Sequence, residues 1–361
     1  MENKFGRQKK YDYIRVFLTV LVIIGHCAFY NINTPFGGIS YKTMMESNDI
    51  CFNTYIRNFI IWFSNMIYSF HMPVFFTLSG VLFFREYEAG KWQHFNILLK
   101  AKTKRLLIPL IFTWLFWNIP IKYISGYYDG VKIKDIFLQI IFPSNVYLWF
   151  LEALYIVFLL AYIIRKYIGK NKKVCFLIVF LWIVGFSLQR KNSAWIPLGN
   201  PMKYLAWFWL GGYIEGIITF FSKKYTKLKI SLFMALLSWF VVYLLSSLYL
   251  KSRVRLLRET VLPFFAIVVI WYIFGYVADI MGNKQYTIIK NLSSYSFGVY
   301  LYAEPLNYLI LFVITKLYGI DFLGKEWGSL VEIMLRLFGT FLAAILITFI
   351  LKKVKFPVKA Y

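Results

Sequence analysis

Apolar stretches of about twenty residues, separated by short polar linkers, repeat along the chain. A helix needs roughly 20 apolar residues to cross a bilayer, so each stretch predicts one membrane-spanning helix. The predicted spans, about ten, are residues 13–31, 57–84, 104–122, 145–165, 173–189, 203–221, 230–250, 258–279, 293–315 and 329–351. We also expect a short surface helix at 134–142. The predicted fold is all-α: one polytopic membrane domain over residues 1–361, without a separate soluble domain.

Composition agrees with a membrane protein. The chain is 60% hydrophobic and only 16% charged, whereas about a quarter of the residues in an ordinary soluble domain are charged. The longest polar linker covers residues 31–57 and is too short to form a soluble domain. The apolar spans therefore account for nearly the whole molecule.

The chain is strongly basic, with 41 Lys and Arg against 16 Asp and Glu. A basic excess can indicate nucleic-acid binding, but here the charges lie in short linkers between apolar stretches, so we expect a lipid bilayer as partner and no nucleic acid. If the N-terminus is cytoplasmic, the cytoplasmic linkers and termini carry 25 Lys and Arg and the opposite side carries 14, which favours both ends inside. The basic stretch Lys251–Arg258 falls on the other side. Either it binds an anion there, or the predicted orientation is wrong in the second half.

The first apolar stretch resembles a signal peptide but is too long, contains Arg15 and His26, and lacks a small-residue cleavage site. We therefore predict that it stays as the first membrane helix. The three cysteines are scattered, without metal-binding spacing, so we expect neither a disulfide framework nor a metal. Cys27 follows His26 but lies about 100° round the helix, which argues against a Cys–His nucleophile pair.

Arg15 and His26 share one face of the first predicted helix. They are eleven residues apart, which places them within about 20° of each other around the axis and about 16 Å apart along it. Ionisable side chains are costly in hydrocarbon, so those found there are functional candidates by default. We expect His26 about five residues inside the outer end of the helix, with Arg15 close to the cytoplasmic surface.

Further ionisable residues occupy the predicted spans. Glu152 is expected at a depth similar to that of His26, and His71 nearer the middle of the membrane. Lys102 and Arg105 begin the third span on the cytoplasmic side. Because they are three residues apart, we expect them to face the same way.

The basic residues and the buried imidazole together fit an acyl-coenzyme A. Arg15, Lys102 and Arg105 would form a basic entrance on the cytoplasmic side, and clusters of Arg and Lys bind phosphates. A thioester on the long arm of coenzyme A could then reach His26, where an acceptor hydroxyl would arrive from outside. Burial favours the neutral imidazole, which is the form that a general base requires.

Several blocks resemble the acyltransferase 3 family of membrane O-acyltransferases. YDYIRVFLTVLVIIGH at 11–26 matches the family's Arg followed by His eleven residues later. SFHMPVFFTLSGVLFF at 69–84 is similar to its second-helix block, especially in the glucan-modifying branch, and KTKRLLIP at 102–109 to its basic third-helix entrance. Later blocks match at 147–154, 208–213 and 296–301. The resemblance covers about residues 11–352.

The resemblance implies transfer of an acetyl or similar short acyl group from cytoplasmic acyl-CoA to a hydroxyl of an extracytoplasmic carbohydrate, such as a polysaccharide of the cell envelope. It implies that His26 is essential and that Arg15, Lys102 and Arg105 bind the CoA end. The expected location is a cell membrane, that of a bacterium. Two departures are that Lys102 replaces an Arg, losing bidentate phosphate geometry, and that Ala303 stands where the family often has a His. Glu304 follows it and is the candidate substitute.

We predict that His26 removes the proton from the acceptor hydroxyl, either directly or through a transient acyl-enzyme. Glu152 or Glu304 would orient the imidazole or help to hold the acceptor. His71 either belongs to the site or satisfies a carbonyl that Pro73 frees.

Glu332 and Arg336 are four residues apart, so we interpret them as an ion pair within one helix and assign them no catalytic role.

The main alternative is a transporter or exporter of a polysaccharide or small anion, since transporters also bury charge. Inverted repeats and matched broken helices would favour it, and the sequence contains neither. A weaker alternative is a regulatory subunit that keeps the fold without activity, suggested only by the residue at 303. The acceptor, the choice among acetyl, succinyl and longer groups, and whether the chain forms homo-oligomers stay open.

Overall fold

The computed structural model describes residues 9–34, 36–138, 147–169, 171–191, 195–224, 236, 240 and 252–353. Helices make up most of these residues, and the two short strands among them form a single hairpin. The predicted all-α fold class is therefore confirmed. The predicted span at 230–250 lies almost wholly outside the described residues.

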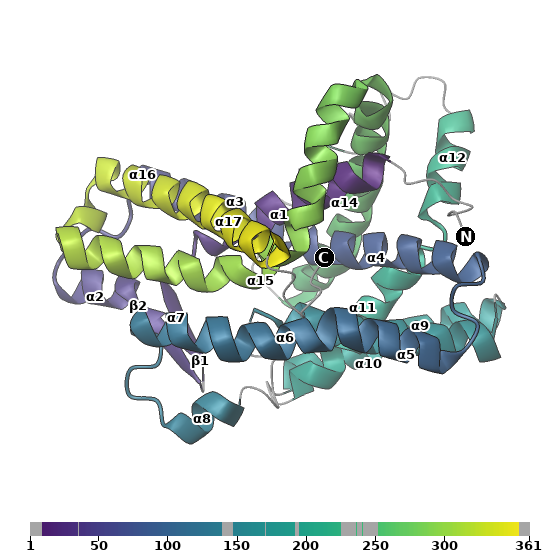
Figure 1. The fold of residues 1–361 in the computed structure, drawn as a ribbon, viewed down its shortest axis with the longest axis horizontal. Coiled ribbons are helices and arrows are strands. Elements are labelled where there is room, and N and C mark those ends of the chain that lie inside the picture. Colours follow the sequence, from purple (N-terminus) through teal and green to yellow (C-terminus); the bar gives the residue numbers. More distant parts are fainter. Residues whose placement is uncertain are drawn as a thin grey trace. The chain divides into compact units, whose positions relative to one another are not determined.

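Figure 1 shows the order of the elements along the chain. The strands are β1 (Asn31–Thr34) and β2 (Gly37–Ser40). The α-helices are α1 (Lys9–His26), α2 (Tyr41–Ser47), α3 (Tyr55–Tyr68), α4 (His71–Glu88), α5 (Phe95–Lys102), α6 (Ile108–Thr113), α7 (Ile119–Ile124), α8 (Ile133–Leu138), α9 (Trp149–Tyr167), α10 (Lys172–Lys191), α11 (Ile196–Leu210), α12 (Ile214–Lys224), α14 (Ser252–Ile280), α15 (Asn283–Tyr318), α16 (Glu326–Met334) and α17 (Thr340–Lys353). The described residues also form three π-helical turns, η1 (Thr103–Leu107), η2 (Trp114–Asn118) and η6 (Leu335–Gly339), and a 3₁₀ turn, η5 (Asp321–Gly324).

Among the described residues, six helical stretches are long and apolar enough to cross a membrane. They are Tyr55–Glu88, Phe95–Ile124, Lys173–Arg190, Glu259–Ile280, Asn283–Tyr318 and Glu326–Lys353. Each contains or closely matches a span predicted from the sequence. The total of ten stays a prediction.

Several predicted boundaries are wrong. Helix α1 ends at His26, so the imidazole lies on the last helical residue and not five residues inside the span. The predicted span at 203–221 is divided into α11 and α12 by a turn at residues 211–213, where Gly211 and Gly212 weaken the helix. The stretch 57–84 contains a break between α3 and α4, because Pro73 cannot donate a hydrogen bond to the preceding turn.

Two other predicted segments correspond to helices. The surface helix expected at 134–142 corresponds to α8, as far as the described residues extend. Within the basic stretch Lys251–Arg258, residues 252–258 form the first turns of α14.

The chain divides into two compact units. The first comprises Met1–Leu18, Tyr68–Lys102 and Ala153–Ser293; the second comprises Thr19–Ile67, Thr103–Glu152 and Ser294–Tyr361. In the first unit, α4 packs on α11 through small residues. A Cβ on Gly80 would lie 1.9 Å from the Phe208 carbonyl oxygen, and one on Gly211 would lie 2.4 Å from that of Thr77. These glycines let the two backbones approach as closely as they do.

In the second unit, the linker after α1 is ordered. Strands β1 and β2 pair antiparallel, with Asn31 opposite Ser40 and Thr34 opposite Gly37. The Gly38 amide donates to the Tyr127 carbonyl at 2.8 Å, and Gly37 has φ +114°. Only glycine suits that backbone angle and this close approach, since a Cβ on Gly37 would lie 2.4 Å from the same carbonyl oxygen. Figure 1 shows the hairpin beside α2 and α7.

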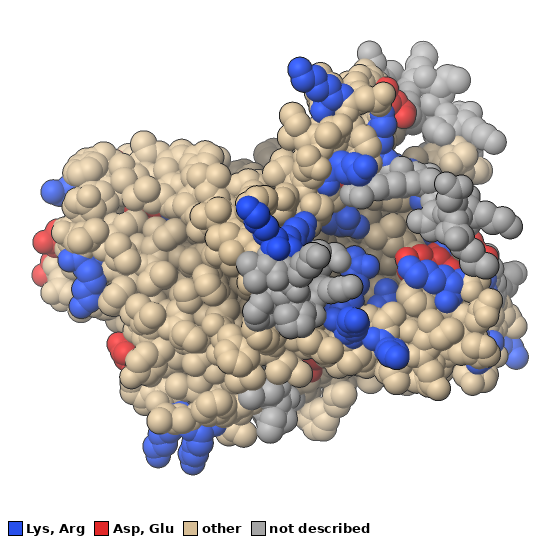
Figure 2. All heavy atoms as spheres, viewed as in Figure 1, with Lys and Arg blue, Asp and Glu red and all other residues tan. Residues whose placement is uncertain are grey.

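Most of the face shown in Figure 2 carries neither acidic nor basic side chains. Exposed large apolar residues are numerous on the described helices; those on α17 include Leu342, Leu346, Phe349 and Ile350. Such surfaces are expected where helices contact lipid instead of water.

Candidate functional site

A buried ion pair lies in the second unit. Lys122 Nζ and a Glu304 carboxylate oxygen are 3.0 Å apart, and their side chains are 1% and 5% exposed. The Lys122 ammonium also lies over three tyrosine rings, 4.2 Å from the ring centre of Tyr127, 5.3 Å from Tyr308 and 5.6 Å from Tyr147. An ammonium enclosed by a carboxylate and aromatic faces keeps its charge stabilised away from water.

Tyr147 connects this pair with His26. The His26 ring meets the Tyr147 ring edge-on, with the ring centres 6.4 Å apart, and Lys122 lies over the same tyrosine. Two residues predicted for catalysis, His26 and Glu304, are thus brought into one cluster. We call His26, Lys122, Tyr147 and Glu304 the histidine cluster.

The sequence Glu304-Pro305 explains how Tyr147 is held. Pro305 has no amide hydrogen, so the Leu301 carbonyl four residues earlier loses its usual helical donor. The Tyr147 hydroxyl donates to that carbonyl at 2.5 Å, and the Tyr300 hydroxyl donates to the Tyr147 carbonyl at 2.7 Å. The proline in α15 therefore creates the acceptor that anchors the ring.

The end of α1 is held by Arg336, which is fully buried. Its Nη2 donates to the carbonyl oxygens of His26 and Phe29, each at 3.0 Å. Nε donates to Asn307 Oδ1 at 2.5 Å, and Nη1 pairs with Glu332 at 2.6 Å. Carbonyls at a helix C-terminus have no partner within the helix, and one guanidinium supplies it here.

The pair predicted between Glu332 and Arg336 is therefore confirmed, but it does more than join two turns of one helix. Glu332 also accepts a hydrogen bond from the Tyr30 hydroxyl at 2.9 Å, and Asn307 donates to the Cys27 sulfur at 3.5 Å. These bonds hold Cys27, Phe29 and Tyr30, three of the four residues that follow His26. They fix the backbone from which the imidazole projects.

Arg15 lies in the first unit, in a network at the start of α1. Its Nη1 donates to Ser293 Oγ at 3.0 Å and lies 3.6 Å from the Asp12 carboxylate. Asp12 also accepts from Ser293 Oγ at 2.7 Å and from the Tyr286 hydroxyl at 2.9 Å. The side chain of Arg15 is 29% exposed, so it keeps surface for an anion beside its acidic neighbour.

The prediction that Lys102 and Arg105 face the same way is wrong. Lys102 is buried at the end of α5, with Nζ 3.6 Å from the ring centre of Phe158 and 5.1 Å from that of Trp92. Arg105 lies in the π-turn η1 and is exposed. A π-turn holds more residues than an α-turn, so the usual three-residue spacing no longer returns to one face.

The two remaining candidates lie in different units. His71 is the first residue of α4 in the first unit, 4% exposed, with its ring edge-on to Tyr68 at 4.9 Å. Glu152 lies in the first turn of α9, in the part assigned to the second unit, and is partly buried.

Sequence reasoning missed several members of these networks, among them Lys122, Tyr147 and Asp12. Lys122 ends the predicted third span and resembles an ordinary boundary lysine, and Tyr147 resembles an interfacial tyrosine. Asp12 had a signal that could have been used, because it precedes Arg15 by three residues and can reach it within the helix.

Comparison with known protein families matches residues 8–351 to a family model described as an acyltransferase domain, that of the acyltransferase 3 family. The match covers nearly the whole chain and includes both units. No curated protein and no solved structure gave a significant match.

Proposed function

Because the chain belongs to the acyltransferase 3 family and is a membrane acyltransferase, we propose that it transfers an acetyl or similar short acyl group from acyl-CoA to a carbohydrate hydroxyl. In this proposal both chain ends are cytoplasmic, acyl-CoA enters from that side, and the acceptor is extracytoplasmic. The acyltransferase family was predicted from the sequence and is confirmed; the donor and acceptor are proposals.

The observation that carries the proposal is the placement of His26. It ends α1 with its backbone fixed by Arg336, and its ring meets Tyr147 beside the buried pair of Lys122 and Glu304. A general base must be held in a fixed position, and a group held in this way typically contributes about 10²–10⁴-fold in rate.

In the proposed reaction, a ring nitrogen of His26 removes the proton from the acceptor hydroxyl as its oxygen attacks the thioester carbonyl. The C–S bond then breaks, the acyl group stays on the acceptor as an ester, and the CoA sulfur leaves with the proton from the imidazolium. Lys122, which lies over the Tyr147 ring that His26 meets, would supply the positive charge for the oxyanion, and Glu304 holds that lysine in place. In this proposal Glu304 acts through Lys122, whereas the sequence analysis expected it to orient the imidazole or help to hold the acceptor.

As candidate ligands of the CoA phosphates we keep two residues predicted from the sequence, Arg15, whose side chain is 29% exposed, and Arg105, which is exposed. Lys102 lies against Trp92 and Phe158, so its contribution is to shape the entrance and not to bind a phosphate in a bidentate way. No step of the proposed reaction requires a metal.

The test uses the purified full-length chain in lipid nanodiscs with acetyl-CoA and oligosaccharide. Wild type should release free CoA thiol and form a labelled ester, and His26→Gln should lower ester formation by at least 100-fold. His94→Gln, a change at an exposed histidine, is the matched control and should behave as wild type. Full activity of His26→Gln would remove the imidazole from the mechanism, and transport of acceptor without thiol release would support the exporter instead.

A second measurement concerns the donor. Arg105→Glu should weaken acetyl-CoA binding by about tenfold or more, because the change replaces attraction for phosphate by repulsion. Lys104→Glu, at an exposed neighbour in the same π-turn, separates a specific contact from a general loss of positive charge. Equal effects at 104 and 105 would contradict a specific phosphate contact at Arg105.

A further inference from the structure

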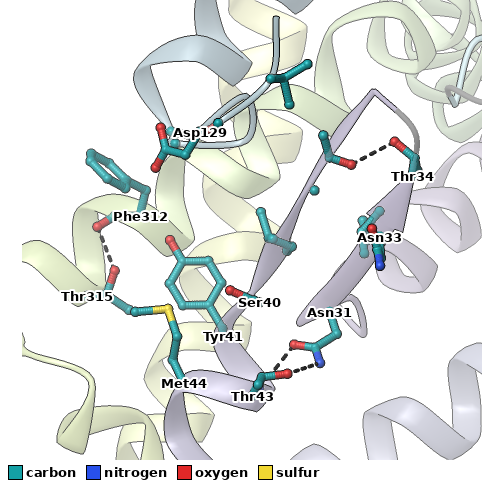
Figure 3. Close-up of a pocket in the computed structure, with 18 of the residues that line it drawn as sticks. Asn31, Asn33, Thr34, Ser40, Tyr41, Thr43, Met44, Asp129, Phe312 and Thr315 are labelled. Carbon is teal, nitrogen blue, oxygen red and sulfur yellow. Dashed lines mark hydrogen bonds between the residues drawn. The ribbon is translucent and has the colours of Figure 1, made fainter.

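A cavity of about 990 Å³ lies within the second unit. Three stretches form its walls. They are the hairpin with the start of α2 (31–44), the turn region after α7 (125–135), and the last turns of α15 together with Ile320, which lies just beyond that helix. Figure 3 shows the hairpin on one side, with Phe312 and Thr315 of α15 opposite. The volume is at the upper end of the range for ligand pockets, roughly 300–1,000 Å³.

Some polar groups in the walls are used to build them. The Asn31 side chain donates to Thr43 Oγ1 at 2.8 Å and accepts from the Lys42 amide at 2.9 Å, so it fastens β1 to the start of α2. Thr34 Oγ1 donates to the Gly37 carbonyl at 2.7 Å, which closes the hairpin turn. These bonds give the cavity walls that form without a ligand, which lowers the ordering cost of binding.

Other lining groups are suited to a ligand that is rich in hydroxyls. The walls contain the carboxylates of Asp129 and Asp135, the amide of Asn33 and the ammonium groups of Lys132, Lys134 and Lys316. Carboxylates accept hydrogen bonds from hydroxyls, and ammonium and amide groups donate to their oxygens. Because both signs of charge are present, the walls suit a neutral ligand with many hydroxyls better than a strongly anionic or cationic one.

Aromatic groups complete this lining. Figure 3 shows the Tyr41 hydroxyl directed toward the side where Phe312 and Asp129 lie. Burial raises the pKa of the Tyr41 phenol, so its hydroxyl stays protonated near neutral pH and is able to donate. Aromatic rings offer apolar contact to the C–H faces of a sugar while polar groups bind its edge.

Residues that line the cavity follow members of the histidine cluster closely along the chain. Asn31 follows His26 by five residues, a chain distance of at most about 17 Å. Ser125 follows Lys122 by three residues. Phe312 follows Glu304 by eight residues of one helix, about 12 Å along its axis. A chain of a few sugars can bridge such distances.

We propose that this cavity binds the acceptor as an oligosaccharide of several sugar units and presents one hydroxyl toward His26. The inference rests on the proposed acyl transfer and adds the residues that recognise the acceptor. Asp129 and Asn33 bind hydroxyls, and Phe312 contacts a sugar face.

The experiment fills the cavity without touching the histidine cluster. Ser40→Trp adds an indole at an exposed lining position just before α2, and Ser47→Trp adds the same group at the other end of α2, outside the lining. Asp129→Asn removes one acceptor charge with little change in shape. Each full-length variant is assayed in nanodiscs with labelled acetyl-CoA and maltopentaose, laminaripentaose or chitopentaose as acceptor, and its acetyl-CoA affinity and thermal stability are measured separately.

We expect Ser40→Trp to lower ester formation at least tenfold, and Asp129→Asn to raise the acceptor KM about tenfold, the equivalent of about 1.4 kcal/mol. The acetyl-CoA affinity of both should equal that of wild type, and Ser47→Trp should match wild type in every assay. If wild type esterifies an oligosaccharide but Ser40→Trp and Asp129→Asn keep its acceptor KM, the cavity is not the acceptor site and the proposed function stands. If wild type esterifies none of the three acceptors, both proposals fail together.

Discussion

Replacing Arg336 by lysine tests whether the bonds at the end of α1 position the proposed base. Lysine keeps the positive charge beside Glu332, but its single ammonium nitrogen replaces the three nitrogens of the planar guanidinium group. It therefore loses the two bonds to the carbonyls of His26 and Phe29 and the bond to Asn307. A buried acceptor left without its donor costs about 1–3 kcal/mol. The Phe29 carbonyl incurs this cost, whereas the His26 carbonyl keeps a hydrogen bond from the Phe29 amide at 3.3 Å.

The cost in activity should be separable from the cost in stability. Once released, the last turn of α1 can shift, and a displacement of about 1 Å at a catalytic group can lower the rate about 100-fold. Arg57→Lys is the matched control, because Arg57 is also fully buried and donates to two carbonyls, those of Phe52 and Leu323, both at 2.6 Å. Neither of these carbonyls belongs to the turn that carries His26.

The assay compares kcat for ester formation per folded molecule, acetyl-CoA affinity and thermal stability in both variants. We expect both to lose stability, and only Arg336→Lys to lose about 100-fold in kcat, with donor affinity kept. If Arg336→Lys and Arg57→Lys reduce kcat equally after correction for folded protein, Arg336 has only a structural role and its bonds at the end of α1 do not position His26 for catalysis.

Three further predictions concern the second unit and the orientation of the chain. Lys122→Met should destabilise the protein by about 3–5 kcal/mol, because it leaves the Glu304 carboxylate buried without its cation. In thermal unfolding, the double variant Lys122→Met with Glu304→Leu should recover most of that stability, although not the activity. A double variant no more stable than the single one would contradict an ion pair. Gly38→Ala should lower the melting temperature, since a Cβ there would lie 1.8 Å from the Ile32 carbonyl oxygen, and a melting temperature equal to wild type would show that the hairpin can move aside. In intact cells a membrane-impermeant maleimide should label Cys51, which the proposed orientation places outside, but not Cys175, which it places at the cytoplasmic side; both thiols are exposed. The variants Cys51→Ser and Cys175→Ser identify which thiol is labelled. The reverse pattern would invert the proposed orientation.

The sequence predicted those features that depend on neighbouring residues. Apolar length gave the six long stretches, and helical periodicity placed Arg15 and His26 on one helix, as α1 confirms. The linker at 31–57 was not recognised as structured, because NINT and GGIS are short, polar and rich in glycine. Their pairing depends on Tyr127, almost ninety residues later, whose carbonyl receives the Gly38 amide.

The parts of the candidate site that the sequence did not predict are contacts between distant residues. Arg336 lies 310 positions from the His26 carbonyl that it binds. Lys122 and Glu304 lie in different helices, and no local pattern pairs them. The π-turn at η1 also moved Lys102 and Arg105 to different environments, and nothing in the sequence distinguishes such a turn from ordinary helix.

Helix α15 determines how the molecule can change in length. Glu304, Asn307, Phe312 and Thr315 all project from it without interruption, and they serve the buried ion pair, the end of α1 and the cavity in turn. Inserting a single residue after Asn307 would rotate everything beyond it by about 100° and advance it by about 1.5 Å. A change of acceptor preference on this helix must therefore come from substitutions that keep its length. Insertions and deletions can be accommodated instead in the turns that line the cavity, those of the hairpin and of residues 125–135.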